Sequence, residues 1–396
     1  MPTYDFDKVV NRLGTDSGKW LRYPEDVLPL WVADMDFMSP PEVVRALHER
    51  IDHGVFGYGC DPVELRGLIV QRMQDRYNWA IAENDIVFLP GLVSGFNIAA
   101  RAIGQRGDGV MVCTPVYFPF LTAPANQHRQ LRNAPLTVSR RIVDGLETLY
   151  YEMDMDAVDR AINADTRLHI LCNPHNPVGR AFTRSELETL ASKCLENDIV
   201  ICSDEIHCDL LLGDTRHIPI ASLDSEIADN AITLMAPSKT FNLPGLACSF
   251  AIITNPELRA KYERASAGIV PHVNVLGITA ATAAYGQCAD WERQLCDYLE
   301  SNRDFLVEYV RERLPGVAIT IPEATYLAWL GLGKLDLPAE PQEYLLNVAK
   351  VACNEGATFG KGGEGFVRVN FGCPRVTLQE GLDRIGEALF DSRPIG

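Results

Sequence analysis

The alternation of hydrophobic and polar residues predicts a layered α/β protein. Residues 183–198, "TRSELETLASKCLEND", place five apolar side chains on one helical stripe: Leu187, Leu190, Ala191, Cys194 and Leu195. Thr183 and Glu186 have the spacing of a capping box, so we expect the helix to begin there. The apolar run "LHILC" precedes it and "DIVIC" follows it. Strand, helix and strand at this spacing predict a parallel βαβ unit.

Three similar apolar runs, "DIVFL", "GVMVC" and "AITLM", are expected to be further strands. A second amphipathic segment, "PPEVVRALHERID", follows Ser39. Ser39 and Glu42 have capping-box spacing, Pro40 would occupy the first helical position, and Gly54 could end the helix. The sequence therefore predicts a helix-rich N-terminal arm ahead of the sheet.

The pattern changes after about residue 285. A long charged helical segment, "DWERQLCDYLESNRDFLVEYVRERL", is followed by two strand-like runs, "TYLAWLGL" and "FVRVNF". This change predicts a smaller α+β domain beside a larger α/β domain. We expect an N-terminal arm over residues 1–42 that joins the small domain, a large domain over 43–285 and the small domain over 286–396.

Composition narrows the possible functions. The 396 residues are 47% hydrophobic and 22% charged, as in an ordinary globular protein, and the net charge of −17 argues against a general affinity for nucleic acid or anionic membrane. The N-terminus lacks a basic segment followed by an apolar run, and no apolar stretch approaches membrane-spanning length. We therefore expect a soluble cytoplasmic protein.

The eleven cysteines are an odd number and show no paired CxxC spacing. Several of them, such as Cys113, Cys172 and Cys202, end apolar runs that are expected to be buried strands. We interpret them as reduced core thiols, with metal ligation as the minor alternative. No metal site is expected.

The candidate chemistry lies just after the expected strands. Ligands of parallel α/β sheets collect beyond the carboxyl ends of the strands. Five segments follow the five apolar runs: "PGLVSGF", "TPVYFPF", "NPHNPVG", "SDEIHCD" and "APSKTFN". An isolated lysine is usually an exposed surface group. Here Lys239 would share one crevice with a carboxylate, an amide, an aromatic ring and a helix N-terminus, which indicates a binding site.

These segments, in this order and spacing, resemble the fold-type I, pyridoxal-phosphate-dependent aminotransferase superfamily over essentially the whole chain. The segments "PLWVADMDF", "DEIHCDL", "APSKTFNLPGL" and "GFVRVNFGCPR" are most similar to its branch of cysteine-sulfur β-lyases of the MalY/PatB type. The resemblance implies pyridoxal 5′-phosphate as cofactor. It also implies a large domain with a mostly parallel seven-stranded sheet flanked by helices, and a smaller α+β domain.

The resemblance assigns roles around the cofactor ring. Lys239 would be the Schiff-base lysine and the base that takes the substrate Cα proton. Asp204 would pair with the pyridine nitrogen, Asn176 would hydrogen-bond the ring O3′, and Tyr117 would stack on the ring. Taken alone, Asp204 could cap a helix, Asn176 could be a turn residue and Tyr117 could be a core aromatic.

Further roles concern the substrate and the phosphate. Arg368 would bind the substrate α-carboxylate by a bidentate fork, with Asn176 and Ala33 beside it; alone, Arg368 could be a surface residue of an edge strand. Four residues are the candidates for binding the phosphate: Leu92 and Val93 through their backbone N–H groups, Ser238, and Tyr58 from a partner subunit. The resemblance therefore implies a homodimer with shared active sites.

Three positions depart from the usual aminotransferase pattern. His207 stands where a tyrosine is common and is expected to lie against the cofactor. Ala247 replaces a common arginine, and Ala236 replaces a common serine. The usual positive charge beside the phosphate is therefore missing, although these residues fit the β-lyase branch.

The motifs leave two reactions open, because transamination and β-elimination both begin with removal of the Cα proton by Lys239. The branch resemblance favours β-elimination on cystathionine or another S-substituted cysteine, which yields a thiol, pyruvate and ammonia. An aminotransferase is the alternative, and a regulatory module that only binds cofactor or a partner is a third hypothesis. A nicotinamide dehydrogenase is disfavoured, since no G-x-G-x-x-G follows an expected strand.

Overall fold

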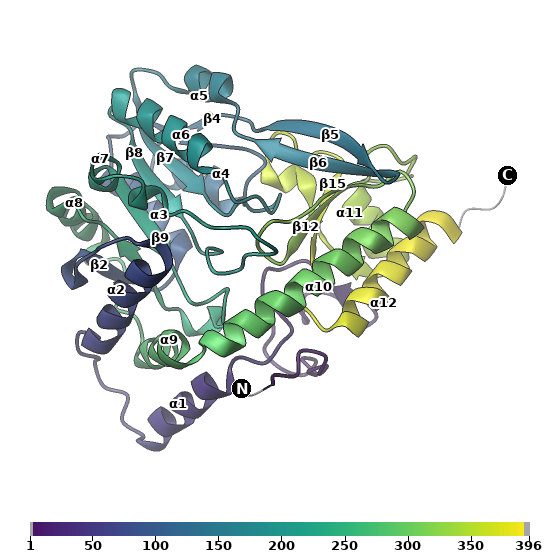
Figure 1. The fold of residues 1–396 in the computed structure, drawn as a ribbon, viewed down its shortest axis with the longest axis horizontal. Helices are drawn as coiled ribbons and strands as arrows, with labels where there is room; N and C mark the ends of the chain where they lie inside the picture. The colour runs from purple at the N-terminus through teal and green to yellow at the C-terminus, as the bar shows by residue number, and fades with distance from the viewer. Residues whose placement is uncertain (1–2, 392–396) are drawn as a thin grey trace.

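The computed structural model describes residues 3–391 and contains two large sheets (Figure 1). The larger has seven strands in the order β2-β10-β9-β8-β7-β3-β4. Its strands are β2 (Ile86–Leu89), β3 (Gly109–Val112), β4 (Gln130–Asn133), β7 (Thr166–Cys172), β8 (Val200–Asp204), β9 (Ala231–Met235) and β10 (Ser249–Ile252). β10 runs antiparallel to both of its neighbours, β2 and β9, and the other strand pairs of this sheet are parallel. The expected mostly parallel seven-stranded sheet is confirmed.

Helices cover the large sheet because its central strands are apolar on both faces. Every residue of β3 and of β9 is buried. The helix α6 (Arg184–Glu196) begins at the predicted capping box, in which Thr183 accepts from the N–H of Glu186 and the Glu186 carboxylate accepts from the N–H of Thr183. Its buried stripe packs with the strands as expected. Local sequence therefore sets this βαβ unit.

The second sheet has six strands in the order β14-β15-β12-β11-β6-β5. Its strands are β5 (Thr137–Val143), β6 (Leu146–Glu152), β11 (Ala318–Thr320), β12 (Leu327–Gly331), β14 (Asn354–Glu355) and β15 (Phe366–Asn370). β6 pairs in parallel with β11, although β5 and β6 precede β11 by more than a hundred residues in the chain. The hairpin β5–β6 thus links the two parts of the fold.

The remaining helices surround these sheets (Figure 1). They are α1 (Pro41–Asp52), α2 (Val63–Tyr77), α3 (Leu92–Ala102), α4 (Pro119–Asn126), α5 (Met155–Ala161), α7 (Ser225–Asp229), α8 (Pro256–Ser266), α9 (Val275–Gln287), α10 (Ala289–Arg313), α11 (Pro341–Tyr344) and α12 (Arg375–Gly386). Figure 1 shows the long α10 running beside α12 next to the second sheet. Among the described residues, no helix combines the length and apolar composition needed to span a bilayer.

We propose a division into an arm (1–42), a large domain (43–285) and a small domain (286–396). The two sheets support it, since the seven-stranded sheet lies wholly within 43–285 and four of the six strands of the second sheet lie within 286–396. The β5–β6 hairpin would then extend from the large domain into the small one.

The prediction for the N-terminal arm was wrong in two respects. Residues 3–40 contain no helix, and their only strand, β1 (Leu28–Pro29), pairs with β13 (Val351–Ala352). The helix α1 (Pro41–Asp52) forms, but Pro41 occupies its first position and no side chain caps it. The Ser39 hydroxyl instead donates to the carbonyl of Asn242 at 3.1 Å. A contact with a distant part of the chain replaces the local cap.

The contribution of the Thr183 cap to stability can be tested by mutation. Replacing Thr183 by alanine should lower the free energy of unfolding by about 1 kcal/mol, because an N–H at the helix start loses its acceptor. Thr189→Ala, on the exposed face of the same helix, is the control and should stay within about 0.5 kcal/mol of the wild type. Urea unfolding followed by circular dichroism measures both, and equal effects of the two substitutions would contradict the assigned cap.

Candidate active site

One cavity of about 230 Å³ lies beyond the carboxyl ends of the central strands. It receives side chains from the loops after β2, β3, β7, β8 and β9, from residues 31–33 and from β15. The predicted site residues that line it are Ala33, Leu92, Val93, Tyr117, Asn176, Asp204, His207, Ser238, Lys239 and Arg368. Tyr58 is not among them and is fully exposed. The fold therefore brings together every predicted site residue except the one assigned to a partner subunit.

Lys239 lies in the turn after β9, with its amine inside the cavity. Its Nζ donates to the backbone carbonyl of Ala33 at 2.5 Å. Burial and the positive charge of Arg368 together lower the pKa of Lys239 from 10.5 to about 8, although Asp34 and Asp204 oppose the shift. A large fraction of the amine is therefore neutral near pH 8, as a nucleophile or base requires.

Asp204 is the last residue of β8 and is almost completely buried. Burial raises the pKa of its carboxyl to about 7. Two neighbours oppose this shift by favouring the charged form: the backbone N–H of Ile206, which donates to Asp204 Oδ1 at 3.1 Å, and the amine of Lys239. A buried carboxylate is stabilised by a cationic partner. Asp204 is therefore suited to pair with a protonated ring nitrogen.

Arg368 is a buried cation in β15 whose partners in the structure are neutral. Its guanidinium donates to Asn176 Oδ1 at 2.9 Å, to the Trp31 carbonyl at 2.9 Å and to Asn354 Oδ1 at 2.6 Å. Its Nε is buried without a partner among the described residues. Burial lowers the pKa of Arg368 to about 10, so it stays charged at neutral pH. A buried cation with neutral partners favours an anionic ligand.

His207 and Tyr117 complete the walls around the expected ring. His207 is buried, and its Nδ1 has no partner in the described part of the chain. Burial, together with the charges of Lys239 and Arg368, holds its pKa well below the usual range, so the imidazole is neutral. The backbone N–H of Tyr117 donates to the carbonyl of Asn176 at 3.1 Å, and this bond joins the loop after β3 to the loop after β7.

The other end of the cavity is formed by the start of α3. Leu92 and Val93 are the first residues of this helix, so their backbone N–H groups have no acceptor within the helix. Ser238, Ala236 and Ala247 line the cavity as well. Among the described residues that line the cavity, only Lys239 and Arg368 are lysines or arginines, so an anion at this end would rely on N–H and hydroxyl donors.

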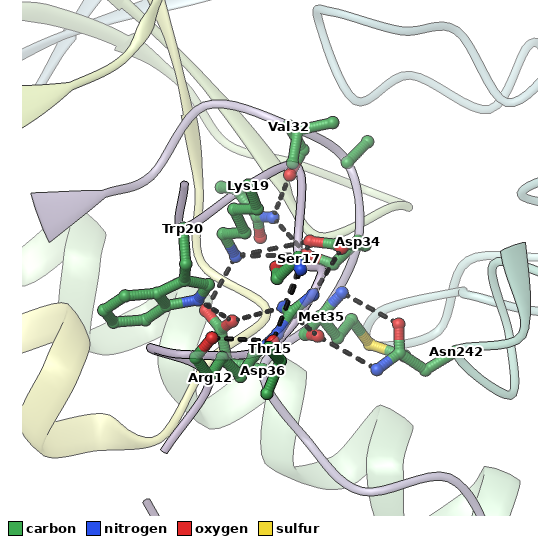
Figure 2. Close-up of polar contacts among 12 residues, drawn as sticks. Arg12, Thr15, Ser17, Lys19, Trp20, Val32, Asp34, Met35, Asp36 and Asn242 are labelled. Carbon is green, nitrogen blue, oxygen red and sulfur yellow. Dashed lines mark hydrogen bonds and ion pairs between the residues drawn. The ribbon is translucent and has the colours of Figure 1, made fainter. Parts of the chain in front are cut away.

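Sequence reasoning missed the charged cluster that holds residues 31–37 against the cavity. Figure 2 shows Asp36 surrounded by three donors: Lys19 Nζ at 2.7 Å, Arg12 Nη1 at 2.7 Å and Trp20 Nε1 at 2.9 Å. Burial alone would raise the pKa of Asp36, but Lys19, Trp20 and Arg12 outweigh it and lower the pKa. No local pattern around Lys19 signals that its side chain is completely buried.

Asn242, three residues after Lys239, fastens the same segment from the other side (Figure 2). Its amide accepts from the N–H of Met35 at 3.0 Å and donates to the carbonyls of Met35 at 2.9 Å and Phe37 at 2.8 Å. The turn that carries Lys239 therefore also positions the segment whose Ala33 carbonyl contacts Lys239. The motif "SKTFN", in which Asn242 follows Lys239 by three residues, was the available signal.

A family model described as aminotransferase class I and II matches residues 25–385. The chain belongs to this family. Cystathionine beta-lyase PatB of Bacillus subtilis (strain 168) is 39% identical over 392 residues, which cover 97% of this chain and 100% of PatB, and this places the chain in the PatB branch. The expected family and branch are confirmed.

Two solved structures extend the comparison. The crystal structure of OvoB superposes with a TM-score of 0.92 at 40% identity and covers 98% of this chain and 100% of that one. The PLP-bound C–S lyase of Staphylococcus hominis superposes with a TM-score of 0.89 at 32% identity, over 98% of this chain and 99% of that one. The expected fold type I architecture is therefore confirmed.

The residues of the cavity fit pyridoxal phosphate. Lys239 offers an amine of lowered pKa, Asp204 a buried carboxylate for a cationic ring nitrogen, and the start of α3 free N–H groups for a phosphate. The unpartnered Nδ1 of His207 and Nε of Arg368 are polar atoms that a bound ligand could satisfy. The protein is thus a pyridoxal-phosphate-dependent enzyme.

The lowered pKa of Lys239 can be measured without the cofactor. Because burial disfavours the charged amine, Lys239 should lose its proton with a midpoint of about 8, so its acetylation by acetic anhydride should rise as the pH passes through that value. Peptide mass spectrometry of cofactor-free protein gives the rate at each pH. The exposed Lys361 in the same samples corrects for reagent loss. A midpoint at the ordinary lysine value of about 10.4 would contradict the described surroundings.

Proposed function

We propose that this enzyme cleaves the Cβ–S bond of S-substituted cysteines such as cystathionine. One water is consumed, and the products are a thiol, pyruvate and ammonia. The observation that carries the proposal is that a base of lowered pKa, a buried carboxylate and a buried cation with neutral partners share one cavity: Lys239, Asp204 and Arg368. Relatives of this chain that are named as lyases support it.

The geometry suggests what each residue does. Arg368 would bind the substrate α-carboxylate, because its hydrogen-bond partners in the structure are neutral and do not balance its positive charge. Asp204 would hold a proton on the ring nitrogen, while Asn176 and Tyr117 orient the ring. Pyridoxal phosphate, when bound, supplies a conjugated ring that stabilises negative charge at Cα. Lys239 would take the Cα proton, after which the thiolate can leave from Cβ.

Transamination is the second candidate, because it uses the same binding residues and the same proton transfer. The two reactions differ in what leaves the substrate. β-Elimination requires a thiolate on Cβ, whereas transamination requires a keto acid as second substrate. The family contains aminotransferases, so the assay below measures both.

We further propose a homodimer in which Tyr58 completes the partner's site. Residues 51–61 are all exposed and include Val55, Phe56 and Tyr58, an apolar run that a second copy would cover. Figure 1 shows that this segment joins α1 to α2 at the edge of the molecule. Since Ala236 and Ala247 leave the phosphate end without a cation, a hydroxyl from a partner would supply a needed donor.

We also propose that the enzyme works in the cytoplasm. All eleven cysteines are free thiols, and nine of them are buried, as expected for a protein of a reducing compartment. The charge of −17 gives no reason to expect a nucleic-acid or membrane partner.

The reaction is tested by supplying cystathionine and a panel of cysteine S-conjugates. Pyruvate and free thiol should appear in equal amounts without added keto acid, and Lys239→Ala should abolish both, because it removes the amine that binds the cofactor and takes the proton. Ser185→Ala, on the exposed surface of α6, is the control for purification and should retain full turnover. Amino-group transfer that depends on a keto acid, without thiol release, would show an aminotransferase instead.

The shared site is tested by mixed dimers. Tyr58→Phe should weaken cofactor binding by about ten- to hundred-fold, the typical effect of losing one hydrogen bond to a charged group. Mixing Tyr58→Phe chains with Lys239→Ala chains should form hybrids with one doubly damaged site and one intact site, so turnover should recover at low cofactor concentration.

Size exclusion with differently tagged chains establishes that the hybrids form. Phe56→Leu, a nearby change without a hydroxyl group, is the matched control and should leave cofactor affinity within about twofold of the wild type. Hybrids that form without recovery would place Tyr58 outside the partner's site.

A further inference from the structure

The residue after Lys239 is tied to a buried carboxylate that the proposed mechanism does not use. The hydroxyl of Thr240 donates to Asp209 Oδ2 at 3.1 Å, and neither residue is appreciably exposed. Asp209 lies five residues after Asp204, in the loop that follows β8. One hydrogen bond therefore connects the loop that carries Asp204 to the turn that carries Lys239.

Asp209 is held by two arginines, which also contact a second carboxylate. Its Oδ1 accepts from Arg72 at 2.8 Å and from Arg76 at 3.0 Å, both on α2. The same arginines contact Glu292 of α10, at 3.0 Å from Arg72 and 2.5 Å from Arg76. Two arginines and two carboxylates balance in charge, and the cluster, in which Asp209 and Glu292 are buried and Arg76 is partly exposed, joins α2 to the long helix α10.

The turn around Lys239 has two tethers that differ in direction. Asn242 ties it to residues 35–37, and Thr240 ties it to Asp209. Successive residues of a tight turn project in different directions, so fixing the side chains at 240 and 242 also fixes the rotation of the turn. That rotation decides where the side chain of Lys239 points.

We propose that Asp209 and Thr240 are positioning residues, which hold the amine of Lys239 in the cavity that it shares with Asp204. The Arg72, Arg76 and Glu292 side chains keep the Asp209 carboxylate charged and in one orientation. The inference deepens the proposed function and rests on it only for the catalytic role of Lys239. It predicts that loosening the turn changes the chemistry of the amine more than it changes substrate binding.

Several titratable groups surround Asp209 and affect the pKa of its carboxyl. Those facing it are Arg72, Arg76 and Tyr77 of α2, Tyr285 of α9, Glu292 and Cys296 of α10, and Cys208 of its own loop. Burial would raise the pKa of Asp209, but Arg72 and Arg76 hold it below the usual value. The carboxylate therefore remains an acceptor for Thr240 at neutral pH.

The test compares Thr240→Val, Thr240→Ser and Thr233→Val in the full-length protein. Thr240→Val keeps the side-chain shape but removes the donor, whereas Thr240→Ser keeps the donor. Thr233, in β9, is equally buried but its hydroxyl has no partner among the described residues, so Thr233→Val is the matched control. Acetylation of Lys239 in the cofactor-free protein reports the amine, and kcat and KM for thiol release report the loaded enzyme.

Thr240→Val should raise the labelling midpoint of Lys239 by about half a pH unit or more, because water that reaches a looser turn reduces the cost of charging the amine. It should lower kcat by about tenfold, the scale of one lost hydrogen bond to a charged group, and leave KM within about twofold. Thr240→Ser and Thr233→Val should match the wild type in both measurements.

The outcomes separate this inference from the proposed function. A wild-type midpoint and kcat in Thr240→Val, or equal changes in Thr233→Val, would overturn the positioning role. If Thr240→Val does not fold, Thr240→Ala, which adds no methyl group next to Asp209, replaces it with the same expectations. Amino-group transfer without thiol release in the wild type would overturn the proposed function, and thiol release that survives Lys239→Ala would overturn the catalytic role of Lys239. In either case the labelling midpoint in cofactor-free protein would still test the tether.

Discussion

The active site depends on the need to satisfy the backbone carbonyls of the partly buried segment 31–36. This segment passes through the protein outside any sheet, so its carbonyls need side-chain donors. The donors come from every part of the fold: Arg368 binds the carbonyl of Trp31, Lys239 that of Ala33, and Asn370 those of Val32 and Asp34. Satisfying these carbonyls brings the lysine and the arginine of the site to one short segment.

The charges in the cavity explain why its ligands should be anions. Arg368 and Lys239 contribute positive charge, and both are destabilised as cations by burial. A phosphate at the start of α3 and a carboxylate at Arg368 would each lie where the protein has donors but few counter-charges. Asp204 is the complementary case, since its raised pKa falls once a cationic group lies opposite. Binding of ligands of opposite charge thus offsets the desolvation free energy of the charged groups that are buried in the folded protein.

Features set by neighbouring residues could be predicted from the sequence, and features set by distant ones could not. The strands, the cap at Thr183 and the residues after each strand follow from periodicity and from the geometry of parallel sheets. The cap expected at Ser39 fails because its hydroxyl is used by Asn242, some two hundred residues away. The burial of Lys19 and the tie between Thr240 and Asp209 also arise only in the folded chain. The family resemblance supplied the roles that spacing alone left open.

Because the chain is synthesised from its N-terminus, the long-range contacts of residues 31–36 limit the order in which parts of the fold can form. Trp31 meets Arg368 across 337 residues, and Asn370 reaches Val32 across 338. A nascent chain that has completed the seven-stranded sheet still lacks β15, and therefore the wall that holds residues 31–36 in place. The carbonyls of Trp31 and Val32 can gain these donors only after β15 has been synthesised. The wall of the cofactor pocket formed by residues 31–36 is therefore expected to assemble later than the seven-stranded sheet.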